Sequence, residues 1–190
     1  MNLGDNMKVI ETELKDCYII EPDVFGDHRG YFFQTHSEKD LKNYGIDVHF
    51  VQGNESFTAN KNTIRGLHFQ TSEMAQAKLV RCTSGAIYDV AVDLRKDSPT
   101  YKKWIKVELS NDNKRQLFLP RGFAHGFLTL TDNVTFVYEV DNFYSKEHDA
   151  GFAWDDPEIG VDWGIEEGVE PILSDKDKNA PLLKNSRADF

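Results

Sequence analysis

The sequence has 190 residues, of which 39% are hydrophobic and 28% are charged, and this composition argues for a folded chain rather than a disordered one. A net charge of −10 argues against a general nucleic-acid binder, because such proteins are basic. The two cysteines, Cys17 and Cys82, lie in no paired-cysteine motif, so we expect buried thiols rather than a disulfide scaffold. Neither a signal-peptide pattern nor an apolar run of membrane-spanning length is visible, and we expect a cytoplasmic protein with a single domain over residues 1–190.

The predicted elements are one helix followed by short strands. The helix begins at Ser37, has Asp40 three residues later and ends at Gly45. Period-2 alternation of apolar residues then predicts strands over 86–94, 104–109, 116–119, 126–131 and 135–140, separated by turn-forming residues. The chain after Asp155 is rich in Asp, Pro and Gly and is expected to wrap the strands as loops with one short helical turn. Regularly spaced short strands predict an antiparallel sandwich or barrel.

Two histidines stand apart from the other four. His28, His36, His49 and His148 lie in polar or turn-like contexts and are expected at the surface, whereas His68 and His125 each adjoin a strand and have arginine and glycine neighbours. Residues 120–125 fit the pattern PxGxxH, which occurs in metal-binding cupin barrels. A metal site would then use His68, His125 and Glu73, but Gln70 stands where a second histidine belongs. Two histidines alone make a poor zinc or iron site, so the sequence favours no metal.

Proton transfer suits His68 better than metal binding does. The free pKa of an imidazole lies near neutral pH, and a carboxylate on its far nitrogen would fix its tautomer, although the pattern does not identify that carboxylate. Tyr138 shares a strand face with Phe136 and Val140 and is expected to point inward, either as an acid or as a core tyrosine with a satisfied hydroxyl. Arg29 and Arg65 each lie beside a glycine and would suit the oxygens of a diphosphate.

Six segments in order resemble one family, the dTDP-4-dehydrorhamnose 3,5-epimerases. They are RGLHFQ (65–70), KLVR (78–81), YDVAVDLRKDSPTY (88–101), LPRGFAHGF (119–127), WDDPEIGVDW (154–163) and PILSDKD (171–177). The resemblance implies an all-β fold, a jelly-roll (cupin-like) antiparallel β-barrel with a few short helices. It also implies a homodimer that exchanges an N-terminal strand, with no metal and no cofactor.

The implied activity is epimerisation at C3, C5 or both of a nucleotide-linked 4-keto-6-deoxy sugar. The first candidate reaction converts dTDP-4-dehydro-6-deoxy-D-glucose to dTDP-4-dehydro-L-rhamnose, a step of dTDP-rhamnose biosynthesis, with the C4 carbonyl as electron sink. By resemblance, His68 is the base, Asp177 is its carboxylate partner and Tyr138 is the acid on the opposite face. Further residues are assigned to the substrate: Arg29 and Arg65 on phosphates, Tyr144 on the base, and Gln34, Gln52, Asn54, Lys78, His125, Asp149 and Lys176 in the pocket, with Lys78 as the candidate for enolate stabilisation.

Four positions depart from the family pattern. Gln34, Gly53, Glu139 and Asp149 stand where the family commonly has Glu, Asp, Lys and Glu, respectively. These departures leave open a mono-epimerase or an epimerase of a different nucleotide or 4-keto sugar. A metal-dependent cupin enzyme and a non-catalytic sugar-nucleotide binding module are the more distant alternatives.

Overall fold

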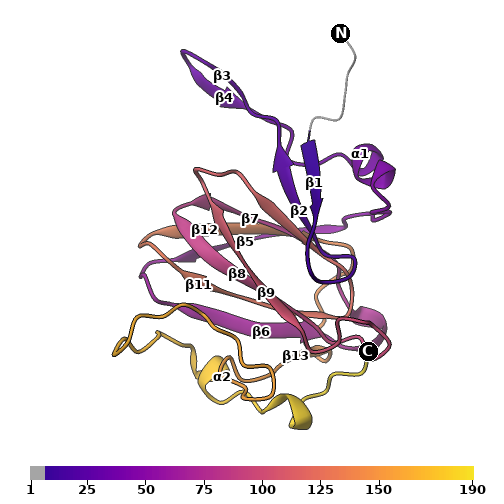
Figure 1. Ribbon diagram of the computed structural model, residues 1–190, viewed down its shortest axis with the longest axis vertical. Coiled ribbons are helices and arrows are strands. Elements are labelled where there is room, and N and C mark those ends of the chain that lie inside the picture. Colours follow the sequence, from indigo (N-terminus) through magenta and orange to yellow (C-terminus); the bar gives the residue numbers. More distant parts are fainter. Residues whose placement is uncertain (1–6) are drawn as a thin grey trace.

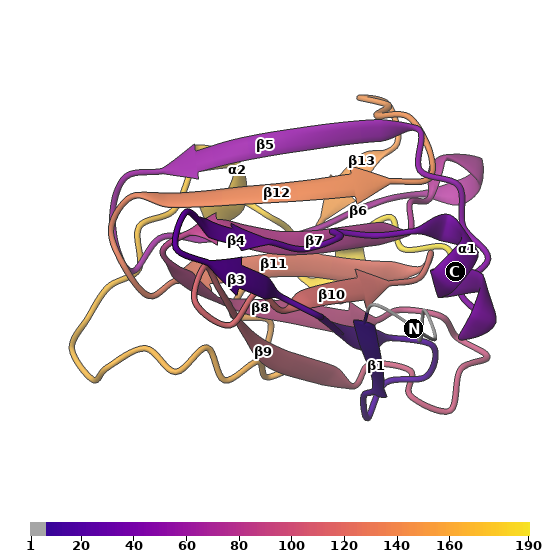
Figure 2. The ribbon, with the colours of Figure 1, turned by 90° about the horizontal axis from the view of Figure 1, so that it is seen from above.

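Two antiparallel sheets contain eleven of the thirteen strands in the computed structural model, which describes residues 7–190. The first sheet has the order β1 (Met7–Glu11), β2 (Tyr18–Pro22), β10 (Gln116–Leu119), β7 (Lys78–Ser84), β12 (Val134–Val140), β5 (Gln52–Thr58). The second has the order β13 (Asp149–Gly151), β6 (Ile64–Gln70), β11 (Phe123–Thr129), β8 (Ala86–Asp93), β9 (Trp104–Ser110). Figure 2 shows β5, β12, β7 and β11 running in similar directions, with β5 and β9 at opposite edges of the barrel. This is the jelly-roll, cupin-like fold that the sequence predicted.

The alternation in segment 86–94 explains how the two sheets pack. Ile87 and Ala91 join Val80 and Phe136 of the first sheet in the cluster between the sheets. Val90 and its alternate neighbours point to the other face of β8, where a second apolar cluster forms. The strands predicted over 86–94, 104–109, 116–119 and 135–140 are confirmed to within one residue at each end. The strand predicted over 126–131 begins earlier, at Phe123, because Phe123 pairs with Asp93 of β8.

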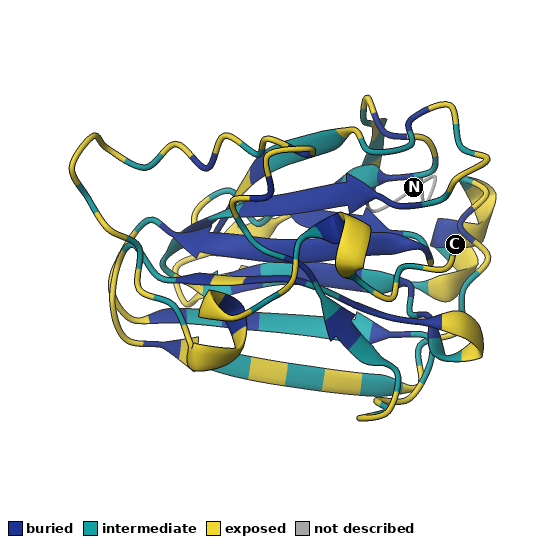
Figure 3. Ribbon diagram, turned by 90° about the horizontal axis from the view of Figure 1, so that it is seen from below, coloured by how far each residue is buried: buried dark blue, intermediate teal, exposed yellow. Residues whose placement is uncertain are grey.

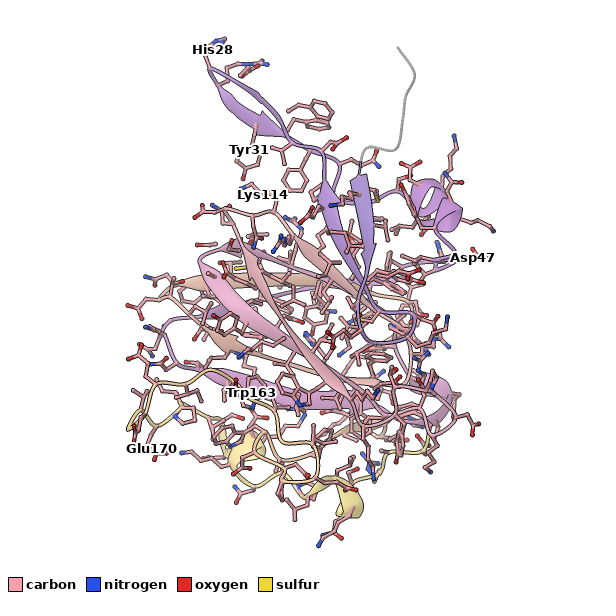
Figure 4. The ribbon with its side chains drawn as sticks, viewed as in Figure 1. His28, Tyr31, Asp47, Lys114, Trp163 and Glu170 are labelled. Atoms are coloured by element: carbon pink, nitrogen blue, oxygen red, sulfur yellow. The ribbon has the colours of Figure 1, made fainter. Side chains whose placement is uncertain are left out.

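The C-terminal chain covers the outer face of the second sheet. Phe152, Trp163 and Leu183 are buried against Val90 and Leu67 of that sheet, and the Trp163 indole N–H donates to the Trp154 carbonyl at 2.8 Å. The segment contains one short helix, α2 (Asp175–Lys178), and a 3₁₀ turn at Leu183–Asn185, as expected for wrapping loops. Figure 3 shows these mostly exposed loops lying over buried strands, and Figure 4 marks Trp163 among them.

The N-terminal part projects at the opposite end of the molecule (Figure 1). Strands β3 (Phe25–Asp27) and β4 (Gly30–Phe32) form a hairpin that carries His28 near its tip (Figure 4). Helix α1 (Glu38–Asn43) follows the hairpin, and its N-cap is Ser37, as predicted, because the Ser37 side chain accepts a hydrogen bond from the Asp40 amide. Elsewhere in the chain, a 3₁₀ turn spans Ser72–Met74. Both cysteines are buried, as predicted. Within residues 7–190, no helix is long and apolar enough to cross a membrane.

Candidate active site

A cavity of about 660 Å³ is lined by strands of both sheets and by the segment around α2. Nine of the thirteen residues predicted for the site line it: Arg65, His68, Lys78, His125, Tyr138, Tyr144, Asp149, Lys176 and Asp177. They come from positions as far apart in the chain as 65 and 177, so only folding brings them together. This convergence of titratable side chains makes the cavity the candidate active site.

His68 lies on β6, where two glycines allow a close approach of the backbone. A Cβ at Gly66, which has φ +129°, would lie 2.5 Å from the Cα of Gly126 on β11. Alanine at either position would therefore push β6 and β11 apart. The register of these strands sets His68 directly across from His125. The glycine in RGLHFQ thus fixes the position of the two histidines relative to each other.

His68 and Asp177 form a hydrogen-bonded pair at the side of the cavity. Nε2 of His68 lies 2.6 Å from Oδ1 of Asp177, which leaves Nδ1 without a hydrogen-bond partner among residues 7–190. The His68 side chain is 32% exposed and that of Asp177 only 4%. A carboxylate in this position orients the ring and stabilises its charged form.

Asp177 is held by the cap of helix α2. The Ser174 hydroxyl donates to Oδ2 of Asp177 at 2.8 Å, and its oxygen accepts from the Asp177 amide at 3.1 Å. Burial alone would raise the pKa of Asp177, but the hydrogen bond and positive charge of His68 and the bond from Ser174 outweigh it and lower the pKa below its usual value. Asp177 is therefore held as a carboxylate facing His68.

A second histidine–carboxylate pair lies deeper in the cavity. Nε2 of His125 is 2.8 Å and 3.0 Å from the two carboxylate oxygens of Asp89, and both residues are buried. Burial raises the pKa of Asp89, and the charge of His125 and its hydrogen bond act in the opposite direction. Burial also lowers the pKa of Lys78 to about 8, although the carboxylates of Asp89 and Asp149 oppose this shift. The interior of the cavity thus disfavours charge and contains a lysine that can titrate near neutral pH.

Tyr138 points inward from β12, as its strand position predicted. Its ring packs against the cluster between the sheets, with the Phe136 ring centroid at 5.6 Å and Nζ of Lys78 at 6.0 Å from its centroid. Burial raises the pKa of Tyr138, the charge of Asp149 raises it further, and Arg65 lowers it. A neutral hydroxyl is the favoured form of this side chain, which is the form that can donate a proton.

Four predicted residues do not line this cavity. Arg29 lies beside the hairpin tip, is exposed, and pairs with Asp27 at 2.6 Å. The Gln34 amide donates to Asp40 at 3.0 Å. The Gln52 amide donates to Asn54 at 2.8 Å, and its oxygen accepts from the amide of Tyr144. Gln52 and Asn54 thus lie one contact away from a lining residue, whereas Arg29 projects away from the barrel.

Sequence reasoning missed several polar lining residues, namely Ser56, Thr63, Gln76 and Ser174. Only Ser174 carried a signal, because it precedes Asp177 by three residues in the capping pattern S-x-x-D. Gln70 also lines the cavity, but its amide donates to the carbonyls of Met74 and Phe143 and its oxygen accepts from the Ser145 amide. Gln70 therefore ties two loops together in addition to facing the cavity.

The alternative metal site lacks its third ligand. Glu73 lies 3.7 Å from His148 rather than beside His68 or His125. Among residues 7–190, no group of three or more His, Cys, Asp or Glu side chains is arranged to hold a metal ion. The two histidines instead each take a carboxylate partner, as residues that transfer or donate protons do.

A jelly-roll barrel whose cavity holds a histidine–aspartate pair, an inward tyrosine and a partly buried lysine contains the groups that a proton-transferring enzyme needs. The sequence profile of the dTDP-4-dehydrorhamnose 3,5-epimerases matches residues 11–185, and the chain belongs to this family. It is 50% identical over 174 residues to the dTDP-4-dehydrorhamnose 3,5-epimerase of Shigella flexneri, covering 91% of this chain and 94% of that protein.

Solved structures agree with this placement. The dTDP-4-dehydrorhamnose 3,5-epimerase of Bacillus anthracis, with TDP and PPi bound, superposes with a TM-score of 0.89 at 51% identity, covering 93% of this chain and 99% of that one. The 3,5-epimerase of Legionella pneumophila in complex with dTDP-4-keto-L-rhamnose gives a TM-score of 0.88 at 41% identity and covers 94% of each chain. The fold and the family prediction are both confirmed.

Proposed function

We propose that the chain is an isomerase that epimerises dTDP-4-dehydro-6-deoxy-D-glucose at C3 and C5, which yields dTDP-4-dehydro-L-rhamnose. The observation that carries the proposal is the His68–Asp177 pair, with Nδ1 of His68 unpartnered, lining the same cavity as Tyr138. The family and the nucleotide sugar bound by the Legionella relative support the choice of substrate.

In the proposed mechanism His68 removes the protons. Hydrogens on C3 and C5 are alpha to the C4 ketone, so breaking either C–H bond sends its electron pair toward the C4 oxygen as an enolate. Nδ1 of His68 accepts the proton, and Asp177 stabilises the imidazolium that forms. No added cofactor takes part in the step, because the ketone itself takes up the electron pair.

Lys78 and Tyr138 are assigned to the other two parts of the reaction. The ammonium of Lys78 stabilises the enolate oxygen, an interaction that strengthens in an environment as poorly solvated as this cavity. Tyr138 returns a proton to the opposite face of the carbon, and this inverts the centre. His125, whose Nε2 is bonded to Asp89, contacts the sugar from the cavity wall.

The nucleotide end of the substrate is assigned to the more exposed part of the cavity. Arg65 is exposed there and is fixed by bonds to the Thr58 hydroxyl and the Phe57 carbonyl, so its guanidinium is positioned for phosphate oxygens. Tyr144 is 58% exposed and its ring would stack on the base, and the Tyr144 backbone amide donates to the side-chain oxygen of Gln52. The residues proposed to contact the substrate here also include Asn54, Asp149 and Lys176. A partner subunit would contribute two more, Gln34 and Arg29.

We also propose a homodimer in which residues 1–190 form one domain and the N-terminal hairpin reaches the partner. The hairpin region exposes Val24, Phe25, Tyr31 and Phe32, which are between 44% and 72% exposed, and burial of such a surface drives association. Arg29 lies beside its tip, so exchange would bring this cation to the partner's cavity. Mixing Arg29→Ala subunits with His68→Asn subunits should restore part of the activity that each variant lacks alone, whereas a mixture without activity would contradict a shared site.

Solvent exchange tests the reaction itself. In D₂O with dTDP-4-dehydro-6-deoxy-D-glucose, deuterium should enter C3 and C5, as detected by NMR. His68→Asn should abolish the exchange and leave dTDP affinity unchanged, while His49→Asn, at an exposed histidine outside the cavity, should behave as the wild type. Binding of dTDP without exchange on any 4-keto sugar would instead make the protein a binding module, and full activity of His68→Asn would remove the assigned base.

A further inference from the structure

The start of strand β13 carries Asp149 and lies at the edge of the second sheet. In the described chain β13 pairs with β6 alone, and their register sets Gly151 opposite His68. The far end of β13 is anchored, because Phe152 is buried and its amide donates to the Leu67 carbonyl at 3.1 Å. The position of Asp149 therefore depends on the contacts at the other end of this short strand.

A second cavity of about 290 Å³ lies behind Asp149. It is bounded by β13 and by the C-terminal segment between Lys176 and Arg187. Three residues, His68, Asp149 and Lys176, line both this cavity and the candidate active site. Nζ of Lys176 is 2.6 Å from Oδ2 of Asp149, so an ion pair forms part of the wall between the two cavities. Because a cavity adjoins it on each side, this ion pair is not locked in place by close-packed side chains.

Arg187 holds the backbone that carries the Asp149 side chain. Its guanidinium donates to the carbonyls of Glu147 and Asp149 at 2.8 Å and 2.5 Å, respectively. The donors of a guanidinium lie in one rigid plane, so two bonds from it restrict both the position and the orientation of this backbone. Arg187 lines only the second cavity, so it acts on the wall of the active site from outside.

The segment that carries Arg187 is itself tied to β6 and to the turn after it. The Asp189 carboxylate accepts from the amide and the hydroxyl of Ser72 at 3.1 Å and 2.5 Å, respectively. The Phe190 ring packs edge-on against the Phe69 ring of β6, with centroids 5.8 Å apart. The match to the family profile ends at residue 185, so these contacts belong to a part of the chain that the profile does not cover. Arg187 therefore extends from a fixed segment, which lets it hold the start of β13 in place.

We propose that Arg187 is a positioning residue that holds the Asp149 carboxylate at the active-site wall and thereby sets the affinity for the nucleotide sugar. The inference rests on the proposed function, in which Asp149 contacts the substrate, and it assigns a role to a residue that does not itself touch the substrate. Among residues 7–190, Arg187 forms no hydrogen bond with His68 or Tyr138, so its loss should weaken substrate binding and leave proton transfer largely intact.

Arg187→Ala tests the inference through a split between KM and kcat. We expect KM for dTDP-4-dehydro-6-deoxy-D-glucose to rise by about tenfold, as for the loss of one hydrogen bond to a charged group, and kcat to stay within about threefold of the wild type. General loosening of the fold would instead lower kcat by reducing the fraction of active enzyme. Arg187→Lys keeps the charge without the planar donors, so its KM should be intermediate. Lys184→Ala, at an exposed position that lines neither cavity, is the matched control and should behave as the wild type.

A double-mutant cycle shows whether Arg187 acts through Asp149. Asp149→Ala should raise KM, and adding Arg187→Ala to it should raise KM no further, because no carboxylate is left to hold. An unchanged KM in either single variant, or independent effects that multiply in the double variant, would overturn the inference while the proposed function stands. A wild type that exchanges no solvent deuterium into any 4-keto sugar nucleotide would overturn the proposed function instead. Should Arg187→Ala fail to fold, Arg187→Lys takes its place in the cycle with the same expectation.

Discussion

Lys78 should make the fold less stable at neutral pH, and its replacement by methionine should reveal how much. Burial lowers the pKa of Lys78 to about 8 from 10.5, even though the Asp89 and Asp149 carboxylates oppose the shift. At about 1.4 kcal/mol per pKa unit, the protonated side chain lowers the free energy of unfolding by about 3 kcal/mol. Methionine is unbranched like lysine and one heavy atom shorter, and Lys78→Met removes the charge, so we expect it to stabilise the protein by up to about 3 kcal/mol while abolishing the exchange reaction.

The pH dependence provides the decisive check. The pKa of Lys78 is lower in the folded state than in the unfolded state. The loss of folding stability caused by its charge is therefore complete below about pH 8 and disappears as the pH rises toward 10.5. Urea unfolding near pH 7 and near pH 10, at one protein concentration, should show a large gain for Lys78→Met at the lower pH and a smaller one at the higher. Lys39→Met, at an exposed position of α1, should change stability by less than about 0.5 kcal/mol. A Lys78→Met protein that is less stable than the wild type near pH 7 would refute the reasoning.

Two further expectations follow from the same cavity. Because the protonated form of Lys78 is proposed to stabilise the enolate, kcat/KM should fall as the pH rises above about 8. A pH profile of kcat/KM that stays level well above this pH would contradict a role of Lys78 in the reaction. Asp177→Asn keeps the shape of the side chain but removes the charge that stabilises the imidazolium, so kcat should fall by about 10² to 10⁴-fold with dTDP affinity unchanged. Asp175→Asn, at an exposed position in the same helix, is its control, and equal activities of the two variants would contradict the assigned role.

The sequence predicted the barrel well because several strands, such as β8 and β9, alternate in sequence and are separated by turn residues. In β8 the pattern separates Ile87 and Ala91 from Val90 and Val92, and the two sets join different buried clusters on the two faces of the strand. A local pattern, Ser37 followed three residues later by Asp40, likewise predicted the N-cap of α1 correctly. Periodicity could not place the start of β11, because Phe123, Ala124 and His125 are buried without alternation.

The site could be predicted only in part, because its contacts are distant along the chain. His68 and Asp177 are separated by 109 positions, and nothing local to either residue indicates that they meet. The family resemblance supplied that pairing, whereas the buried Asp89 opposite His125 was not singled out. The second cavity had no sequence signal, since its walls are small and polar residues of the tail, which pattern analysis treats as loop.

The two histidine–aspartate pairs differ in ways that assign them different tasks. His125 is 9% exposed and contacts both oxygens of an aspartate that is itself fully buried, so its ring is fixed and shielded from water. His68 is 32% exposed, uses only one nitrogen for Asp177, and borders two cavities. A base must both take up a proton and release it, and release requires water or another acceptor within reach. The more accessible His68 meets this requirement, which is why the base is assigned there and hydrogen bonding to the sugar is assigned to His125.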